Sequence, residues 1–299
     1  MSISVIIPTY NGAYKILSLL EALTKQTHHD FETIVVIDGS QDNTIEIVQG
    51  LKTKLNDFKI ITQKNKGRAA TRNAGAQQAK GSLLIFFDDD VEPLDNVVAL
   101  HIKHHLSVND SILVGNLNMD IRGEKNDFYD YRFYIEQKWN AKFSQGTESV
   151  SFQNYRFTSQ NLSMSKELFF SLGGFDERFS DSEDFDLSMK ALLRNIPIYF
   201  NSNIFAWHRD FIDMKGYIKR QKEYLISKQK LLKIHPQYST LYSQTFAFLS
   251  VHKFKRFIGN CFIYNKFWNT VIQSLLFKVL PQKIRYRLYD IIIFSNSIQ

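Results

Sequence analysis

Residues Ser82–Pro93 read Ser-Leu-Leu-Ile-Phe-Phe-Asp-Asp-Asp-Val-Glu-Pro, an apolar run followed by a cluster of acids. The apolar run, Leu83–Phe87, predicts a strand buried on both faces, because a strand covered by helices on each side has no polar face. The run ends in three carboxylates, Asp88, Asp89 and Asp90. Adjacent carboxylates that are shielded from water repel one another strongly. The pKa of at least one of the three carboxyl groups would therefore rise unless a cation bound between them.

The three carboxylates allow two interpretations. An isolated triplet could be a solvated acidic turn that caps the next helix. The alternative is a divalent cation, since carboxylate oxygens with no cysteine nearby suit Mg²⁺ or Mn²⁺, and Mg²⁺ commonly completes its shell with phosphate oxygens. Ligands of open α/β sheets also gather outside the carboxyl ends of strands. The neighbouring segments favour the cation.

Strands and helices alternate along the first part of the chain. The predicted strands are Ile3–Ile7, Phe31–Ile37, Phe58–Thr62 and Leu83–Phe87. This alternation with short connections is typical of a doubly wound, mostly parallel sheet flanked by helices. Pro8 predicts the end of the first strand, because proline does not fit inside a central strand. Right-handed crossovers align parallel strands, so Asp38 should lie at the same sheet edge as Asp88–Asp90.

Composition and charge set the broad class. A chain of 299 residues with 44% hydrophobic content can bury a sizeable core. The single Cys261 excludes an intrachain disulfide and fits a reducing compartment. Met1–Pro8 lacks the basic lead and apolar length of a signal peptide, and no run reaches the roughly 18 apolar residues of a membrane span. We therefore expect a cytoplasmic protein.

The net charge of +7 is unevenly distributed. Residues 215–299 hold 15 Lys and Arg against two acids, a balance of +13, so residues 1–214 carry 22 − 28 = −6. We expect a domain at 1–214 and a basic, aromatic-rich helical extension at 215–299. An acidic body with a metal site and a basic extension suggests catalysis in the first part and attachment to an anionic surface in the second.

Six motifs occur in a fixed order. They are Val5–Asn11, Val36–Thr44, Lys66–Gly75, Phe87–Asp90, Gly173–Glu177 and Glu183–Leu187. Together they resemble the successive motifs of glycosyltransferase family 2, which has the GT-A fold, and the resemblance covers roughly residues 3–210. It implies an inverting transferase that takes a sugar from a nucleotide diphosphate donor with Mn²⁺ or Mg²⁺. The nucleotide-sugar half would be about 1–115 and the acceptor half about 116–214.

The resemblance also implies donor contacts. Asp38 resembles the residue that accepts a hydrogen bond from the uracil ring, and Pro8–Tyr10 the loop that backs this base. Asp90 would bind the metal with support from Asp88, and Asp89 would lie nearer the ribose or sugar. The full nucleotide-sugar set is Pro8, Thr9, Tyr10, Asp38, Lys66, Gly67, Arg72, Asp88 and Asp89.

The second half would supply the acceptor site. In one interpretation, Glu183 and Asp184 are ordinary capping residues, because acids in the first turn of a helix are favoured by the helix dipole. The motif resemblance instead implies that Asp184 is the base, while Glu183 positions the acceptor hydroxyl or a basic neighbour. Trp139 is a candidate for stacking on a sugar. A lone histidine is usually structural, but the resemblance makes His208 a candidate for a metal or diphosphate contact, and Arg209 could assist the leaving group.

The basic extension has three notable segments. Residues 215–236 predict a basic helix, and His252–Phe257 alternates basic and aromatic residues. The apolar positions 267, 268, 271, 272, 275, 276 and 279 predict one continuous helical stripe. The extension could be a helical cap folded onto the catalytic domain, or an amphipathic anchor on an anionic leaflet, peripheral on the inner face of the membrane. An anchor would suit polysaccharide biosynthesis on a glycan or lipid-linked acceptor.

Other functions remain as alternatives. A polyprenyl-phosphate sugar transferase would share the first half and differ only in its acceptor. A non-catalytic nucleotide-sugar binder would keep the same groups without turnover. The basic extension could bind nucleic acid, but no recognised nucleic-acid module accompanies it, and an acidic first part would repel phosphate. We therefore expect no nucleic-acid partner.

Overall fold

The computed structural model describes residues 1–51, 55–122, 126–141, 143, 145–241, 262–263 and 266–297. The chain forms two compact units. The first contains residues 1–120 and 143–210, and the second contains residues 121–142 and 211–299. The second unit thus takes one segment from the middle of the chain besides the C-terminal part. The basic segment expected at His252–Phe257 lies outside the described residues.

A nine-stranded mixed sheet forms the centre of the first unit, with eight strands in the order β3-β2-β1-β4-β8-β6-β9-β5 and β7 paired to β9. The strands are β1 (Ile3–Thr9), β2 (Glu32–Asp38), β3 (Phe58–Gln63), β4 (Leu83–Phe87), β5 (Val91–Pro93), β6 (Ile112–Met119), β7 (Thr147–Val150), β8 (Asn161–Ser165) and β9 (Ile198–His208). The first four pair in parallel, as predicted. Strand β8 then runs antiparallel between β4 and β6.

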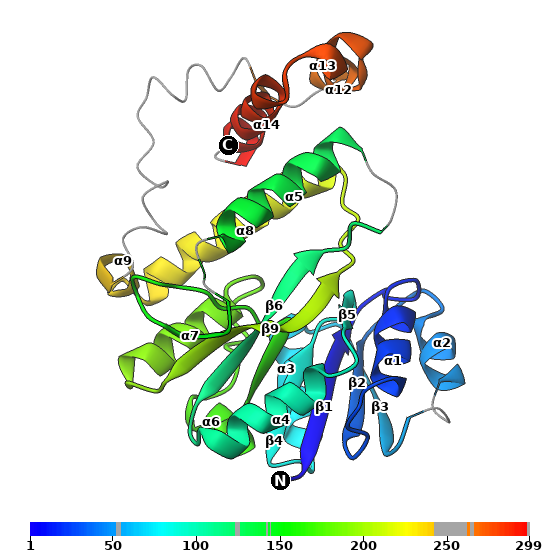
Figure 1. The fold of residues 1–299 in the computed structure, drawn as a ribbon, viewed down its shortest axis with the longest axis vertical. Helices are drawn as coiled ribbons and strands as arrows, with labels where there is room; N and C mark the ends of the chain where they lie inside the picture. Colours follow the sequence, from blue (N-terminus) through cyan, green and yellow to red (C-terminus); the bar gives the residue numbers. More distant parts are fainter. Residues whose placement is uncertain are drawn as a thin grey trace. The chain divides into compact units, whose positions relative to one another are not determined.

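Helices cover both faces of this sheet (Figure 1). They are α1 (Ile16–Thr24), α2 (Thr44–Gly50), α3 (Arg68–Gln78), α4 (Val97–Ser107), α6 (Lys166–Ser171) and α7 (Glu183–Leu193). Alternating side chains of β1 explain the two layers. Val5 and Ile7 pack in the same core cluster as residues of α1, α2 and α4. Ile6 packs in the cluster that includes residues of α3, α6 and α7.

The first strand extends past its predicted end. Strand β1 continues to Thr9, and Pro8 pairs in register with Val36 of β2. On the other side, the pairing with β4 stops at Ile6. Pro8 therefore has a neighbouring strand on one side only, and a residue without an N–H is tolerated where a strand has an open side. The prediction that Pro8 ends the strand was wrong for this reason.

The second unit is helical. Its helices are α5 (Asp127–Asn140), α8 (Met214–Ile234), α9 (Tyr238–Leu241), α12 (Lys266–Gln273), α13 (Leu275–Val279) and α14 (Gln282–Ser297). An aromatic core holds it together, with Phe128, Tyr131, Phe277, Tyr286 and Tyr289 all buried. Among the described residues, no helix combines the length and apolar character of a bilayer-spanning segment.

The apolar stripe expected from residue 267 to 279 is not continuous. Helix α12 ends at Gln273, and Ser274 caps a separate helix, α13, by accepting a hydrogen bond from the N–H of Phe277. Trp268, Val271 and Ile272 pack against the aromatic core. Leu275, Leu276 and Val279 are instead exposed. The change of direction at Ser274 separates the predicted stripe into an inward part and an outward part.

Candidate active site

The loops that follow the parallel strands meet at one edge of the sheet. Thr9 Oγ1, at the end of β1, donates a 2.6 Å hydrogen bond to Asp89 Oδ2, in the loop after β4. Asn11 Oδ1 accepts from the N–H of Gln41, in the loop after β2. Gly12 lies so close to the hydrogen bond between Thr9 and Asp89 that a Cβ at this position would be 2.4 Å from Asp89 Oδ2. The aligned strand ends thus bring together side chains that lie 80 residues apart.

Asp38 organises the loop before α3. Its two carboxylate oxygens accept hydrogen bonds from the backbone N–H groups of Lys66 (2.9 Å) and Gly67 (2.8 Å). Gln63 Nε2 donates a third, at 2.7 Å. The φ of Gly67 is +89°, a conformation that favours glycine, so the sequence at this position suits the turn that Asp38 holds. In this structure Asp38 therefore holds the start of the α3 segment.

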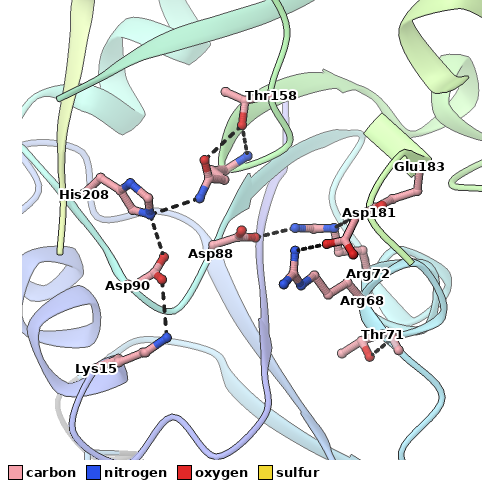
Figure 2. A network of polar contacts seen from close by, with 12 residues as sticks. Lys15, Arg68, Thr71, Arg72, Asp88, Asp90, Thr158, Asp181, Glu183 and His208 are labelled. Carbon is pink, nitrogen blue, oxygen red and sulfur yellow. Dashed lines mark hydrogen bonds and ion pairs between the residues drawn. The ribbon is translucent and has the colours of Figure 1, made fainter. Parts of the chain in front are cut away.

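Asp90 is buried between a lysine and a histidine (Figure 2). Its Oδ2 lies 3.5 Å from Lys15 Nζ, and its Oδ1 lies 3.5 Å from His208 Nε2. The same histidine nitrogen is 3.2 Å from Gln160 Nε2. Burial alone lowers the pKa of Lys15, but the charges of Asp90 and Asp89 raise it above the ordinary value.

Arg72 connects the two acidic motifs (Figure 2). Its Nη2 donates to Asp88 Oδ1 at 2.5 Å, and its Nη1 donates to Glu183 Oε1 at 2.8 Å. The arginine side chain is almost fully buried, and its guanidinium also lies 5.4 Å from the ring centre of Phe175. Although burial alone lowers the pKa of Arg72, the charges of Asp88 and Glu183 raise it, so the arginine stays charged.

Asp184 follows Glu183 in the first turn of α7. Its Oδ1 accepts a 2.7 Å hydrogen bond from the N–H of Phe185. Burial, followed by the charge of Glu183, raises the pKa of Asp184 to about 7, against the opposing effect of Arg72. A carboxyl with a pKa near neutrality exchanges a proton readily at pH 7, as a general base must.

Asp89 has a similarly raised pKa. Burial and the charge of Asp90 raise it to about 7, against the lowering effects of Lys15 and of the hydrogen bond from Thr9. This value agrees with the sequence-based expectation that three adjacent carboxylates raise the pKa of at least one of them. The acidic loop is thus a place where an additional cation would relieve repulsion.

The remaining predicted residues lie in different settings. Pro8 is buried in β1, whereas Tyr10 and Lys66 are exposed. The Arg209 side chain contacts Ser18 and Asp120, and its backbone N–H donates a 2.8 Å hydrogen bond to the backbone oxygen of Asp90. Trp139 is exposed on α5, which belongs to the second unit.

Three features of the site were missed from the sequence. Lys15 contacts Asp90, Gln160 contacts His208, and Arg72 joins Asp88 to Glu183. The motif match included Arg72 only as a donor contact. A buried arginine between two acidic motifs is a long-range pairing that no local pattern reveals, although an arginine within the Ala-rich segment of α3 was a usable signal.

Some of the side chains around Asp90 are suited to bind a metal ion. Within the described ranges, no three His, Cys, Asp or Glu side chains converge as a preformed metal-ligand group. Asp90 and His208 nevertheless place a carboxylate oxygen and an imidazole nitrogen 3.5 Å apart, and this pair of donors suits Mn²⁺. Asp88, the expected third ligand, is directed to Arg72.

Comparisons with solved structures define the class of fold. A mannosyltransferase from Pyrobaculum calidifontis, solved with GDP-Man and Mn²⁺, matches with a TM-score of 0.65 at 16% identity, over 98% of this chain and 85% of the other. Residues 1–349 of Staphylococcus aureus TarS, solved with UDP, match with a TM-score of 0.57 at 20% identity, over 100% of this chain and 90% of the other. The fold is thus that of the GT-A class, as predicted.

Sequence comparison identifies the family. Residues 4–171, more than half of the chain, match the family described as Glycosyl transferase family 2. The chain belongs to glycosyl transferase family 2. An uncharacterized glycosyltransferase of Haemophilus influenzae is 29% identical over 195 residues, which are 64% of this chain and 62% of that protein. The chain therefore spans less than two thirds of the length of this relative.

Proposed function

We propose that the protein is an inverting glycosyltransferase that moves a sugar from a nucleotide diphosphate, UDP in particular, to a hydroxyl of a glycan or lipid-linked glycan. The observation that carries this proposal is the bridge made by Arg72 between Asp88 and Glu183. It joins the acidic loop after β4 to the helix that bears Asp184. A donor site and a proton acceptor are thus linked by one buried cation. Family membership supports a nucleotide-sugar donor.

Asp184 is the proposed base. A single displacement that inverts the anomeric carbon needs one proton acceptor within reach of the attacking hydroxyl. The raised pKa of about 7 matches Asp184 to this task at neutral pH. Glu183, bound to Arg72, fixes the first turn of α7 and so orients the carboxylate beside it. Asp38 and Thr9 hold the donor-side loops in place.

Asp90 and His208 are the residues that would hold Mn²⁺ or Mg²⁺, with Asp88 as a further ligand. When bound, such an ion neutralises negative charge on the departing nucleotide diphosphate, as a Lewis acid does. Lys15 also points its ammonium group at Asp90, so positive charge is already matched to this carboxylate.

Donor turnover tests the proposal. The full chain would be incubated with a panel of UDP- and GDP-linked sugars and Mn²⁺, and release of nucleoside diphosphate would be measured. We expect slow hydrolysis of one UDP-sugar, loss of this activity with EDTA and recovery on addition of Mn²⁺. Tight donor binding with no diphosphate release, with or without acceptors, would identify a non-catalytic binder instead. A panel that includes polyprenyl phosphate separates the two classes of acceptor.

Asp90→Ala is expected to weaken Mn²⁺-dependent donor binding by about 10–100-fold, because loss of a group that holds or orients a metal ligand typically costs this much. The measurement is donor affinity by calorimetry with and without Mn²⁺. Asp57→Asn is the control, since Asp57 is an exposed acid whose pair with exposed Lys80 is a surface contact. Equal Mn²⁺ dependence in Asp90→Ala and the wild type would contradict a role for Asp90 in metal binding.

The pH profile of kcat/KM should report Asp184. A base works when deprotonated, so a pKa of about 7 predicts a plateau above pH 7 and a fall of about tenfold per pH unit below it. An unperturbed aspartate would keep the plateau down to about pH 4. Asp89 has a similar pKa, so the profile of Asp89→Asn is the control, and it should keep the acidic fall. A fall that disappears in Asp89→Asn would assign the titration to Asp89.

We also propose that the protein works as a peripheral protein at the inner face of the membrane, where a lipid-linked acceptor would be presented. The excess of 13 positive charges in residues 215–299 supports this location. A soluble oligosaccharide that serves as well as a lipid-linked acceptor would argue against it.

A further inference from the structure

Three aliphatic side chains of the second unit are unusually exposed. The exposed fractions of Leu275, Leu276 and Val279 are 79%, 80% and 77%, which makes them the most exposed large hydrophobic residues of the described chain. All three lie within five residues, on α13. Scattered exposed leucines need no explanation, but a cluster of three on one short helix does.

The cluster is held outward by a well-packed helix. Phe277, on the same helix, is 2% exposed, and its ring centre lies 5.5 Å from that of Tyr289. Arg285 Nη1 donates to the backbone oxygens of Lys278 and Leu280 at 3.0 and 2.6 Å. These contacts fix α13 at both its core side and its C-terminal end. The outward side chains are therefore presented by a fixed element.

Exposed basic residues lie on the same helix as the cluster and on the helices before and after it in the chain. Lys266, Lys278, Lys283 and Arg287 are all exposed. Residues 262–297 contain five Lys and Arg and one acid, Asp290, whose Oδ1 accepts a 2.7 Å hydrogen bond from Tyr131. The fifth base, Arg285, is paired with Asp127 at 2.9 Å. The segment that carries the exposed apolar cluster thus has an excess of positive charge.

We propose that Leu275, Leu276 and Val279 insert into the surface of an anionic phospholipid bilayer, with the four exposed bases in contact with the lipid headgroups. Exposed aliphatic groups beside Lys and Arg are suited to the boundary between headgroups and acyl chains. A second copy of the chain is the less suitable occupant, because two such faces would bring like charges together. The inference deepens the proposed function, for it names the surface that would bring the enzyme to a lipid-linked acceptor.

Vesicle flotation of the full chain tests this surface. We expect binding to vesicles of phosphatidylcholine with 30% phosphatidylglycerol, and little binding to phosphatidylcholine alone. Leu275→Ser/Leu276→Ser should lower the partition coefficient at least about tenfold, because each buried leucine contributes strongly to transfer from water. Lys278→Gln/Lys283→Gln should lower it by about fivefold per charge. Leu106→Ser is the control, since Leu106 is 68% exposed on α4 of the first unit.

Two results would overturn the inference. One is flotation of Leu275→Ser/Leu276→Ser equal to that of the wild type and of Leu106→Ser. The other is a lipid-free dimer, seen by sedimentation, that the same double substitution abolishes, because the cluster would then be a self-association surface. Donor hydrolysis in solution is measured on every variant. Failed flotation with intact hydrolysis removes only the membrane surface, whereas absent hydrolysis in the wild type removes the proposed enzyme activity.

Discussion

Asp184→Asn should abolish sugar transfer, with kcat lowered by about 10²–10⁴-fold, the range that general bases contribute. The amide has the shape of the carboxylate and its oxygen can still accept the hydrogen bond from the N–H of Phe185. It cannot take a proton from the attacking hydroxyl. Donor affinity should stay within about threefold of the wild type, because the donor-side residues are unchanged. Single-turnover kinetics and donor calorimetry measure the two quantities separately.

Asp186→Asn is the control for this substitution. Asp186 lies on the same helix but pairs with Lys190 at 2.6 Å. Its loss should lower stability while turnover per folded molecule stays close to that of the wild type. If Asp184→Asn keeps wild-type turnover, Asp184 is not the base. If Asp186→Asn loses turnover and Asp184→Asn does not, the proton acceptor has been assigned to the wrong face of α7.

The fold was predictable where it depends on local patterns. The apolar run Leu83–Phe87 matches β4 residue for residue, because a strand buried on both faces leaves a continuous signal. Long-range pairing decided the exceptions. Pro8 stays in β1 because β4 ends before it, and the apolar stripe beyond Phe267 breaks because Ser274 caps a new helix. No local pattern shows which neighbour a strand lacks or which side of a helix meets a core.

The sequence predicted where the acids lie in the fold, but not which cations pair with them. The parallel topology expected from the sequence puts Asp38 and Asp88–Asp90 at one sheet edge, and the strand pairings agree. The cations could not be paired in the same way. Lys15 reaches Asp90 across 75 residues, and Arg72 reaches Glu183 across 111. Such pairs depend on how helices pack over the sheet, which the motif order alone does not specify.

Arg72→Met is expected to lower the free energy of unfolding by about 3–5 kcal/mol, because it leaves buried carboxylates without their cation. Glu183 is almost fully buried and Asp88 is half-buried, so water can replace the guanidinium only in part. Urea denaturation measures the loss. Arg68→Met is the control, since Arg68 lies one turn earlier on α3 and its side chain is 51% exposed in its pair with Asp181, which should be worth less than about 1 kcal/mol.

A second substitution tests the physical cause of that loss, through the sign of the stability change that it produces. In the wild type, Glu183→Gln should destabilise the fold, because Arg72 loses one of its two carboxylate partners. In the Arg72→Met background, the same Glu183→Gln should restore part of the lost stability, because it removes a buried charge that no longer has a partner. A destabilising effect of similar size in both backgrounds would show that Arg72 acts through packing, for example on Phe175, and not through charge. The bridge would then be a structural feature of α3 and α7 with no electrostatic link between the two acidic motifs.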